Sequence, residues 1–466
     1  MAGRIRRIAT AFLSLFALQA LWAGYWQVWR GGELATDARN PRLLLAEERI
    51  HRGAILDRRL RVLAETTYEG ARVVRRYPAG AAGAHVVGYR NLRLGKTGLE
   101  AALDAELLGL EDRALWDDVR DRLTARPRRG LDVVTTLDLD IQSAAFAALG
   151  RRPGAVVVLD ARDGAVLAMA SRPSFDPNEV ESQWEKLRRA EGAPLLNRVL
   201  HGLYPPGSTF KIVTMAAALS RGAATPQTEF TCPGFIVVRG RRITDFGGRG
   251  HGQLTLHDAL VQSCNVAFIE LGLRTRADTL REVSSAFGLG TAPALEMPSA
   301  AGHLPPPQEV ADDGVAQMAF GQGSLLVSPL QMAVVAATIA LEGQRPQPYM
   351  VREVRTYGGR TVDRRSPPGV VRVLAPPVAR AVRAAMVDVV RRGTGRGAGL
   401  PGVAVAGKTG TATVEGRPSH AWFIAFAPAD APRVALAVVL EHGGLGGRDA
   451  APVARRVLQV ALDVVK

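Results

Sequence analysis

The most restrictive feature of this sequence is an uncharged stretch close to its N-terminus. It covers residues 8–29, and a helix of about 22 residues is long enough to cross roughly 30 Å of hydrocarbon. Its far end carries aromatic side chains of the kind that gather where hydrocarbon meets water, at Trp22, Tyr25, Trp26 and Trp29. The stretch therefore predicts a transmembrane helix.

The basic residues before this stretch predict how the helix is oriented. Arg4, Arg6 and Arg7 precede it, and basic residues favour the cytoplasmic side of a membrane. A cleaved signal peptide is the alternative, but no small-x-small cleavage site follows the apolar run, which favours an uncleaved anchor. We expect residues 1–30 to form a cytoplasmic tail and a single-pass anchor in the cell membrane, and the rest of the chain to be extracytoplasmic.

The formal net charge of +15 bears on the partners of the chain. Such a charge would permit nucleic-acid binding, but the arginines are scattered and lack interleaved aromatic residues or a recognisable reading motif. We therefore expect no nucleic-acid partner. A basic exterior also suits anionic lipid headgroups or an anionic polymer.

The chain has room for two or three domains, since it contains 466 residues. The sequence becomes polar after Gly31, and residues 31–150 are rich in arginine and short apolar runs, which predicts a small extended N-terminal domain. Within it, residues 131–137 are expected to form a strand and residues 138–149 a capped helix. Residues 151–466 are predicted to form the large domain.

The large domain has strand-like runs at both ends and helical periodicity between them. Residues 155–160 and 165–170 form a predicted hairpin, and residues 209–340 are mostly helical in pattern. Three further strand-like segments and a closing helix follow, at residues 403–414, 421–427, 434–440 and 452–465. This order predicts an α+β domain whose sheet is closed by its own termini.

A serine and a lysine lie three residues apart at the expected start of a helix in this domain. Pro205, Pro206 and Gly207 are turn formers, and helix-forming residues follow from Ser208 onward. Residues i and i+3 of a helix are neighbours, so we expect the Lys211 amine to lie within reach of the Ser208 hydroxyl. A serine hydroxyl is a weak nucleophile until a nearby base takes its proton, which a desolvated lysine can do.

The presence of lysine at position 211 is itself informative. An S-x-x-K string alone often arises by chance in a chain of this length. This chain uses arginine as its usual cation and has five lysines, at positions 96, 186, 211, 408 and 466. Arginine stays protonated in proteins, so a lysine retained among so many arginines suggests a position that must lose its proton.

A second hydroxyl lies beside an amide in the string Ser263-Cys264-Asn265. The string is expected in a turn between two helical stretches, and Asn265 is one of five asparagines in the chain. A hydroxyl here can relay a proton between Lys211 and a leaving group, and the amide can hold a substrate backbone. By itself, such a string is more often structural.

The string Lys408-Thr409-Gly410-Thr411 lies inside a predicted strand ahead of the last two strands. An ammonium beside threonine hydroxyls can bind a terminal carboxylate, and a glycine lets a substrate lie close to the strand. A second K-T-G string begins at Lys96, but a helix-like sequence follows it and it precedes the large domain. We therefore interpret Lys96 as structural.

The cysteines and histidines do not predict a metal site. Cys232 and Cys264 are too few for a disulfide framework and their spacing fits no metal site, so we interpret them as two small buried residues. None of the eight histidines lies in an H-E-x-x-H pattern. We expect neither a metal nor another cofactor.

The three strings occur in an order that resembles the penicillin-interacting serine transpeptidases: Ser208-x-x-Lys211, Ser263-x-Asn265 and Lys408-Thr409-Gly410. Flanking segments along nearly the whole chain are also similar, at residues 197–198, 250–252, 320–323, 328–333, 393–395 and 421–423. Residues 51–58 and 95–100 resemble the pedestal of the class B, monofunctional members. The resemblance implies a β-lactamase/transpeptidase-like fold, with an antiparallel sheet flanked by helices, attached to a pedestal and a membrane anchor.

The resemblance also implies an activity, because class B members are single-pass membrane proteins whose outer domain cross-links peptidoglycan. By that similarity, Ser208 attacks the carbonyl between the two terminal D-alanines of a stem peptide, and an acyl-enzyme forms as D-alanine leaves. β-Lactams acylate the same serine. Lys211 would be the general base, and Ser263 would pass the proton to the leaving amine.

The same similarity assigns the groups that bind the substrate. Asn265 would hold the donor peptide. The strand that binds the terminal carboxylate of this peptide would contain Lys408, Thr409, Gly410 and Thr411. The oxyanion hole would be the backbone N–H groups of Ser208 and Thr411. An amine of a neighbouring stem then takes the acyl group. The resemblance further implies a polytopic SEDS-type glycosyltransferase as partner.

Several alternatives are weighed against this interpretation. A bifunctional class A enzyme needs a glycosyltransferase domain, for which residues 30–151 leave too little room, and a soluble β-lactamase would lack the anchor and pedestal. A D-Ala-D-Ala carboxypeptidase stays open, because water in place of an amine would complete the same reaction. A non-catalytic penicillin sensor is disfavoured because all the motif residues are present. Cys264 stands where some relatives have Asp, at a position expected to point away from the chemistry.

Overall fold

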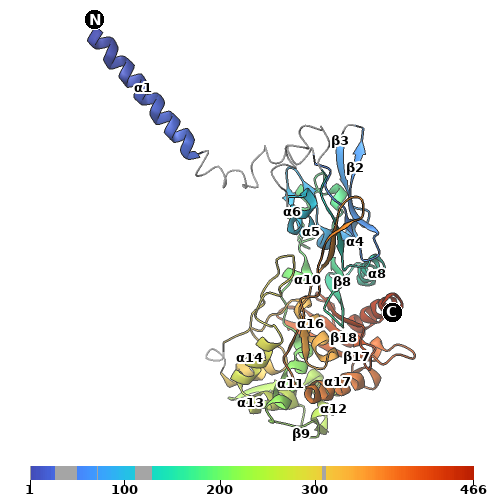
Figure 1. The fold of residues 1–466 in the computed structure, drawn as a ribbon. Helices are drawn as coiled ribbons and strands as arrows, with labels where there is room; N and C mark the ends of the chain where they lie inside the picture. Colours follow the sequence, from blue (N-terminus) through green and yellow to red (C-terminus); the bar gives the residue numbers. More distant parts are fainter. Residues whose placement is uncertain (1, 27–49, 71, 111–128, 307–310, 466) are drawn as a thin grey trace.

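The computed structural model describes residues 2–26, 50–70, 72–110, 129–306 and 311–465 (Figure 1). Helix α1 (Ala2–Gly24) is the one helix in these ranges that is long and apolar enough to cross a membrane. Its side chains are exposed almost throughout, as expected for a helix that packs against lipid. The predicted span continues to residue 29, so its last residues lie outside the described ranges.

Six strands form the sheet of the small domain, in the order β15-β14-β6-β1-β2-β3. Their bounds are Ile55–Leu56 (β1), Val62–Glu69 (β2), Arg72–Arg76 (β3), Asp132–Thr135 (β6), Val351–Arg355 (β14) and Thr361–Arg364 (β15). The domain also contains α4 (Gly80–Val87), α5 (Gly98–Ala102), α6 (Asp104–Leu108), β4 (Arg90–Asn91) and β5 (Gly95–Lys96). Strands β1 and β6 are parallel, and the other neighbouring pairs of this sheet are antiparallel.

Elements cross the predicted domain boundary at residue 150 in both directions. Strands β14 and β15 come from the second half of the chain, yet β14 pairs with β6 at Val354 and Val133. Helix α8 (Leu139–Leu149), which Asp138 caps as predicted, packs its apolar face into the core of the large sheet. The division at residue 150 stays a prediction, because apolar faces rather than chain order decide which sheet an element joins.

Five antiparallel strands form the sheet of the large domain, in the order β17-β18-β19-β7-β8. Their bounds are Gly154–Asp160 (β7), Val166–Arg172 (β8), Ala406–Val414 (β17), Arg417–Ala427 (β18) and Val434–Leu440 (β19). Strands β7 and β19 are neighbours, paired for example at Val157 and Ala437. The prediction of a sheet closed by the two ends of the domain is therefore confirmed.

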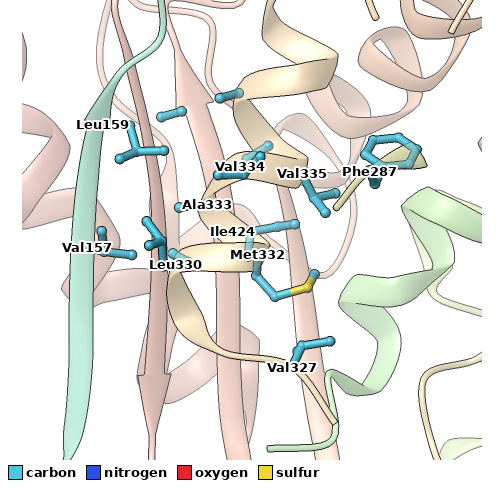
Figure 2. Packing of buried hydrophobic residues seen from close by; sticks show 14 of the residues in the cluster. Val157, Leu159, Phe287, Val327, Leu330, Met332, Ala333, Val334, Val335 and Ile424 are labelled. Carbon is cyan, nitrogen blue, oxygen red and sulfur yellow. The ribbon is translucent and has the colours of Figure 1, made fainter. Parts of the chain in front are cut away.

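Helices cover both faces of this sheet, so its central strands are apolar on both sides. In Figure 2, Leu330 and Val334 of α16 (Pro329–Ala340) lie in the same cluster as Val157 and Leu159 of β7. The alternate β7 residue Val158 belongs to the opposite cluster, with α8 and α18 (Ala451–Val464). Alternate side chains of a strand point to opposite faces, which explains the unbroken apolar runs in the sequence.

The middle of the large domain is mostly helical, as predicted, and lies at the end of the molecule away from the small sheet (Figure 1). Its helices are α11 (Lys211–Ser220), α12 (Leu256–Gln262), α13 (Asn265–Thr275), α14 (Ala277–Ala286) and α15 (Asp312–Ala319); α9 (Trp184–Arg189) and α10 (Arg198–His201) precede it in the chain, and α17 (Pro376–Arg391) follows it. Short strands interrupt them or follow them: β9 (Glu229–Cys232), β10 (Phe235–Val238), β11 (Arg241–Thr244), β12 (Gly252–Thr255), β13 (Gln344–Pro346) and β16 (Val370–Arg372).

Candidate active site

Ser208 lies where a tight turn becomes a helix. The turn is a short 3-10 helix, Gly207–Phe210 (η3), which leads into α11 at Lys211, so Ser208 occupies the first turn as predicted. Gly207 has a φ of 54°, and its N–H donates to the Gly321 carbonyl at 2.8 Å. The backbone of the turn is therefore fixed while the half-buried Ser208 side chain stays on the wall of a cavity.

The cavity has a volume of about 430 Å³ and lies between the edge strand β17, the turn η3 and the start of α13. Five of the predicted site residues line it: Ser208, Ser263, Asn265, Thr409 and Thr411. Three others lie behind its wall and are buried: Lys211, Lys408 and Gly410. All of the predicted residues are thus brought to one place, although their roles remain predictions.

Lys211 is fully buried, and its amine donates to neutral oxygen atoms. Nζ lies 2.6 Å from the Ser263 carbonyl and 2.7 Å from Asn265 Oδ1. Burial lowers the pKa of Lys211 to about 8, although the Asp245 carboxylate favours the protonated form. The expected contact with Ser208 is not a hydrogen bond here, since within the described ranges the Ser208 hydroxyl has no hydrogen-bond partner. The amine instead donates to the Ser263 carbonyl and to Asn265 Oδ1.

Lys408, the second buried lysine, contacts Ser263. Its Nζ donates to Ser263 Oγ at 2.8 Å and to the Thr409 carbonyl at 3.1 Å. Burial, reinforced by the positive charge of Lys211, lowers the pKa of Lys408 well below its usual value. A lysine amine that faces a substrate carboxylate is expected from the motif, but within the protein this amine donates to a hydroxyl on the cavity wall.

Ser263 is the residue that links the two lysines. Its Oγ accepts from Lys408 at 2.8 Å and lies 3.5 Å from Lys211 Nζ. It ends α12 in the left-handed conformation, with a φ of 61°, which is uncommon for a residue with a side chain. Its neighbour Asn265 begins α13. A turn of unusual conformation therefore presents the hydroxyl and the amide to the cavity together.

The close packing around position 410 gives a reason for glycine there that differs from the one the sequence suggested. A Cβ at this position would lie 2.9 Å from the Pro206 carbonyl oxygen, from Thr209 Cγ2 and from Trp422 Cβ. The absent side chain therefore makes room for the protein's own turn η3 and strand β18, rather than for a substrate. This close approach sets β17 against Ser208.

Thr411 faces the turn that carries Ser208. Its carbonyl lies 3.5 Å from Gln322 Nε2, and a Cβ on Gly207 would come within 2.8 Å of the same oxygen. In an extended strand the N–H and C=O of one residue point to the same side, so the Thr411 N–H also faces η3 rather than β18. This orientation agrees with the expected oxyanion donor.

The second K-T-G string lies in the small domain. Lys96 belongs to β5, and its Nζ forms an ion pair with Asp104 at 2.7 Å. This string is not among the described residues that line the cavity. The structural interpretation of Lys96 agrees with this ion pair.

Asp245 and His251 also line the cavity, although they belong to none of the three sequence motifs. The Asp245 carboxylate accepts from the Asn265 N–H at 3.0 Å, next to the Lys211 contact. Both cysteines are buried, as expected, but they lie beside these two residues rather than apart from them. These four residues, Cys232, Asp245, His251 and Cys264, lie within 33 residues of sequence, but their spacing matches no standard zinc motif.

The site and fold are similar to those of known proteins. Residues 154–459 match the family described as penicillin binding protein transpeptidase domain, and residues 52–133 match the penicillin binding protein A dimerisation domain. The chain is 38% identical to the peptidoglycan D,D-transpeptidase PbpA of Mycolicibacterium smegmatis, over 99% of both chains. It is 36% identical to the protein of that name from Mycobacterium tuberculosis, also over 99% of both.

A solved structure of a ceftriaxone acyl-enzyme complex provides a spatial comparison. It is the penicillin-binding protein A of M. tuberculosis, which superposes with a TM-score of 0.85 at 36% identity. The match covers 90% of this chain and all of that one. The similarity thus extends through the small domain as well as the large sheet.

Proposed function

The chain belongs to the penicillin-binding protein transpeptidase family, and from that premise we propose that Ser208 is the nucleophile with which it cross-links peptidoglycan. As a member of this family it is a serine-type D,D-transpeptidase of bacterial cell-wall synthesis that β-lactams acylate. The observation that carries the residue assignment is the convergence of two buried lysines on Ser263 Oγ, in the same cavity wall as Ser208.

Acylation begins when the Ser208 hydroxyl loses its proton to the neutral amine of Lys211. A pKa of about 8 leaves roughly a tenth of the molecules with a neutral amine at pH 7. Burial without a carboxylate partner is what makes this form accessible. The Ser208 oxygen then attacks the carbonyl between the two terminal D-alanines of a stem peptide.

The proton next passes to the leaving D-alanine nitrogen through Ser263. Lys408 donates to Ser263 Oγ, so the hydroxyl must direct its own proton elsewhere, toward the cavity or toward Lys211. The Lys408 charge also stabilises negative charge on this oxygen during the transfer. Asn265, whose amide oxygen is occupied by Lys211, presents its N–H₂ group to the donor peptide.

Strand β17 and turn η3 stabilise two negative charges of the reacting peptide, its terminal carboxylate and the oxyanion at the attacked carbonyl. The Thr409 and Thr411 hydroxyls line the cavity and receive the terminal carboxylate, with Lys408 supplying positive charge from behind the wall. The N–H groups of Ser208 and Thr411 stabilise the oxyanion. Gly410 contributes by letting β17 approach η3 closely.

The same proposal covers the location and partners of the protein. Helix α1, which is long and apolar enough to cross a membrane, is consistent with a single-pass anchor, and Arg4, Arg6 and Arg7 in its first turns support a cytoplasmic N-terminus. The catalytic domain is then extracytoplasmic, where peptidoglycan lies. A polytopic SEDS-type glycosyltransferase is the membrane partner that we propose, and residues 31–150 and 151–466 remain the proposed pedestal and catalytic domains.

Covalent labelling tests the assignment of the nucleophile. We expect labelled penicillin to attach to the full-length protein at Ser208, as located by peptide mass analysis, and the Ser208→Ala variant to remain unlabelled. The exposed Ser182→Ala variant is a matched control that keeps the label. A wild-type protein that stays unlabelled under conditions that label a known transpeptidase would contradict the proposal.

Product analysis separates the transpeptidase from a D-Ala-D-Ala carboxypeptidase. With lipid-linked or polymeric peptidoglycan as substrate, we expect cross-linked dimers among the products. Shortened stems without dimers would instead assign the carboxypeptidase activity. Ser208→Ala should abolish both products, since the two reactions share one acyl-enzyme.

A further inference from the structure

A second cavity lies in the large domain and is separate from the catalytic one. It has a volume of about 270 Å³ and lies between the loop that follows α14, helix α16 and the two-stranded ribbon of β13 and β16. Among the described residues, none lines both cavities. The mechanism makes no use of this space, so the chemistry of its wall indicates what it could bind.

Most of the wall of this cavity is apolar. It contains Phe287 and Val334, which belong to the hydrophobic core (Figure 2), and Pro346, Val370 and Val371 of the ribbon. The two valines are 43% and 56% exposed, so apolar surface at the cavity is open to solvent. A ligand that covered this surface would remove it from water, which is favourable. An apolar body is therefore one requirement for a ligand.

Arg345 is the one charged side chain among the described residues that line this cavity. Its Nε is buried, and in the described part of the chain the guanidinium has no hydrogen-bond or ion-pair partner. A buried donor without an acceptor costs free energy, so such groups are nearly always paired in folded proteins. An anionic acceptor is therefore the second requirement for a ligand.

Contacts within the protein fix the part of the wall that holds Arg345. Gly288 has a φ of 89°, and a Cβ at this position would lie 2.6 Å from Arg345 Nη1, so the glycine leaves room for the guanidinium. Gln331 of α16 donates to the Gly288 carbonyl at 3.3 Å and to the Thr291 carbonyl at 3.0 Å. A wall that is already ordered lowers the entropic cost of binding.

We propose that this cavity binds a small organic carboxylate with an apolar body. A carboxylate is planar and accepts two parallel hydrogen bonds from Nε and a terminal nitrogen of a guanidinium, which Arg345 can donate. At the packing density of a protein interior, the cavity holds on the order of ten non-hydrogen atoms. An amino-acid zwitterion fits less well, since no described residue of the wall is a carboxylate that could pair with its ammonium. Inorganic phosphate would leave the apolar wall uncovered.

The binding of hydrocinnamate, a carboxylate with a phenyl group on a short chain, tests this carboxylate site. With full-length protein in detergent, ligand-observed nuclear magnetic resonance should give a Kd of about 0.1–1 mM, as expected for a ligand of this size. The neutral amide of hydrocinnamate should bind about tenfold more weakly or worse, because it lacks the charge that pairs with Arg345. Arg345→Met, which keeps an unbranched side chain but removes the charge, should weaken hydrocinnamate binding by a similar factor.

Two controls locate the binding. Arg241→Met changes an exposed arginine of β11 that does not line this cavity, and it should bind hydrocinnamate like wild type. Protein whose Ser208 already carries penicillin should also bind it, because the catalytic cavity is then occupied. Both arginine variants should keep the wild-type rate of penicillin labelling, which shows that they are folded.

A photoreactive ligand provides a readout on the wild-type chain if Arg345→Met folds poorly. A short aliphatic carboxylate that carries a diazirine should label residues 287–294 or 345–348, as located by peptide mass analysis. An excess of hydrocinnamate should suppress this label. Label that is confined to other peptides would overturn the carboxylate site.

The outcomes separate the carboxylate site from the proposed function, on which it does not rest. Equal affinity of wild type and Arg345→Met, equal affinity for the acid and its amide, or loss of binding once Ser208 is acylated would each overturn the carboxylate site. Binding as expected by a protein whose Ser208 penicillin never labels would support the carboxylate site and reject the proposed function. Normal labelling without hydrocinnamate binding would reject the carboxylate site and leave the proposed function standing.

Discussion

The small domain and the cavity wall both bury positive charge, but they stabilise it in different ways. In the small domain, Arg52 and Arg75 each donate to Glu100 at 2.7 Å, and all three side chains are nearly inaccessible to solvent. In the cavity wall, Lys211 and Lys408 donate to carbonyl, amide and hydroxyl oxygens. No carboxylate in the described part of the chain lies within ion-pair distance of either amine.

This contrast has opposite effects on protonation. Burial alone would raise the pKa of Glu100, but the Arg75 and Arg52 guanidiniums hold it below its usual value, so the charge is fixed. Burial lowers the pKa of Lys211 to about 8 because no paired carboxylate offsets it fully. A buried charge that is paired with an opposite charge keeps one protonation state. A buried amine without such a partner can gain or lose a proton during a reaction.

The largest effect is expected at Lys211. Lys211→Arg keeps a positive charge but removes a group that can become neutral, so the rate of penicillin labelling at Ser208 should fall by about 10²- to 10⁴-fold. Stopped-flow or gel-based labelling kinetics measure this rate. The exposed Lys186→Arg on α9 is the control and should react like wild type. Labelling of Lys211→Arg at the wild-type rate would mean that another group is the base.

Glu100→Gln should produce the next largest effect, on stability rather than on reaction rate. It leaves the buried Arg75 guanidinium without its carboxylate and Arg52 with Asp104 alone, which costs about 3–5 kcal/mol. Native-state hydrogen exchange in β2 and α5 measures the local loss, because the two domains need not unfold together. The labelling rate of the folded protein should not change.

The control for this change is Glu69→Gln. Glu69 pairs with Arg76 at 2.6 Å, but both side chains are more than half exposed, so the loss should stay below about 1 kcal/mol. The pH dependence provides a second check. The pKa of Glu100 is lower in the folded state, so its stabilising contribution is present above about pH 4.5 and is lost as the pH falls through the folded-state pKa. Glu100→Gln should remove that part of the pH dependence.

Lys408→Arg should have a smaller effect on labelling than Lys211→Arg. Lys408 supplies charge to Ser263 Oγ and need not lose its proton, and arginine also carries that charge. The larger guanidinium still has to fit a fully buried site, so we expect a loss of about tenfold. Equal losses in the two variants, measured in the same labelling assay, would contradict the division of roles between the two lysines.

Lys96→Met should have the smallest effect. Lys96 is partly exposed, and Asp104 keeps its ion pair with Arg52 at 2.6 Å when Lys96 is removed. The stability of the small domain should therefore fall by less than about 1 kcal/mol, and labelling should not change. A labelling defect in Lys96→Met, with the fold intact by circular dichroism, would connect the small domain to the reaction in a way that the contacts do not suggest.

Features that depend on neighbouring residues could be predicted from the sequence. Ser208 follows two prolines and a glycine and precedes helix-forming residues, and it does lie in the first helical turn. The strands of the large sheet follow from apolar runs between turn residues, and β7 and β19 do pair. By contrast, β14 in the small sheet could not be predicted, because β6 and β14 are separated by about two hundred residues and nothing local specifies that pairing.

The sequence by itself determined the N-terminal apolar helix, the order of the three motifs and the local structure around each of them, because these depend on composition, period and turn chemistry within a few residues. The tertiary structure alone decided what surrounds each motif. Lys211 meets Ser263 across 52 residues of chain, and Lys408 meets it across 145. It also decided that Gly410 makes room for the protein itself, and that Cys232 and Cys264 lie together with Asp245 and His251. Burial, partner and charge state arise only when distant segments pack, so a residue's chemistry is set there.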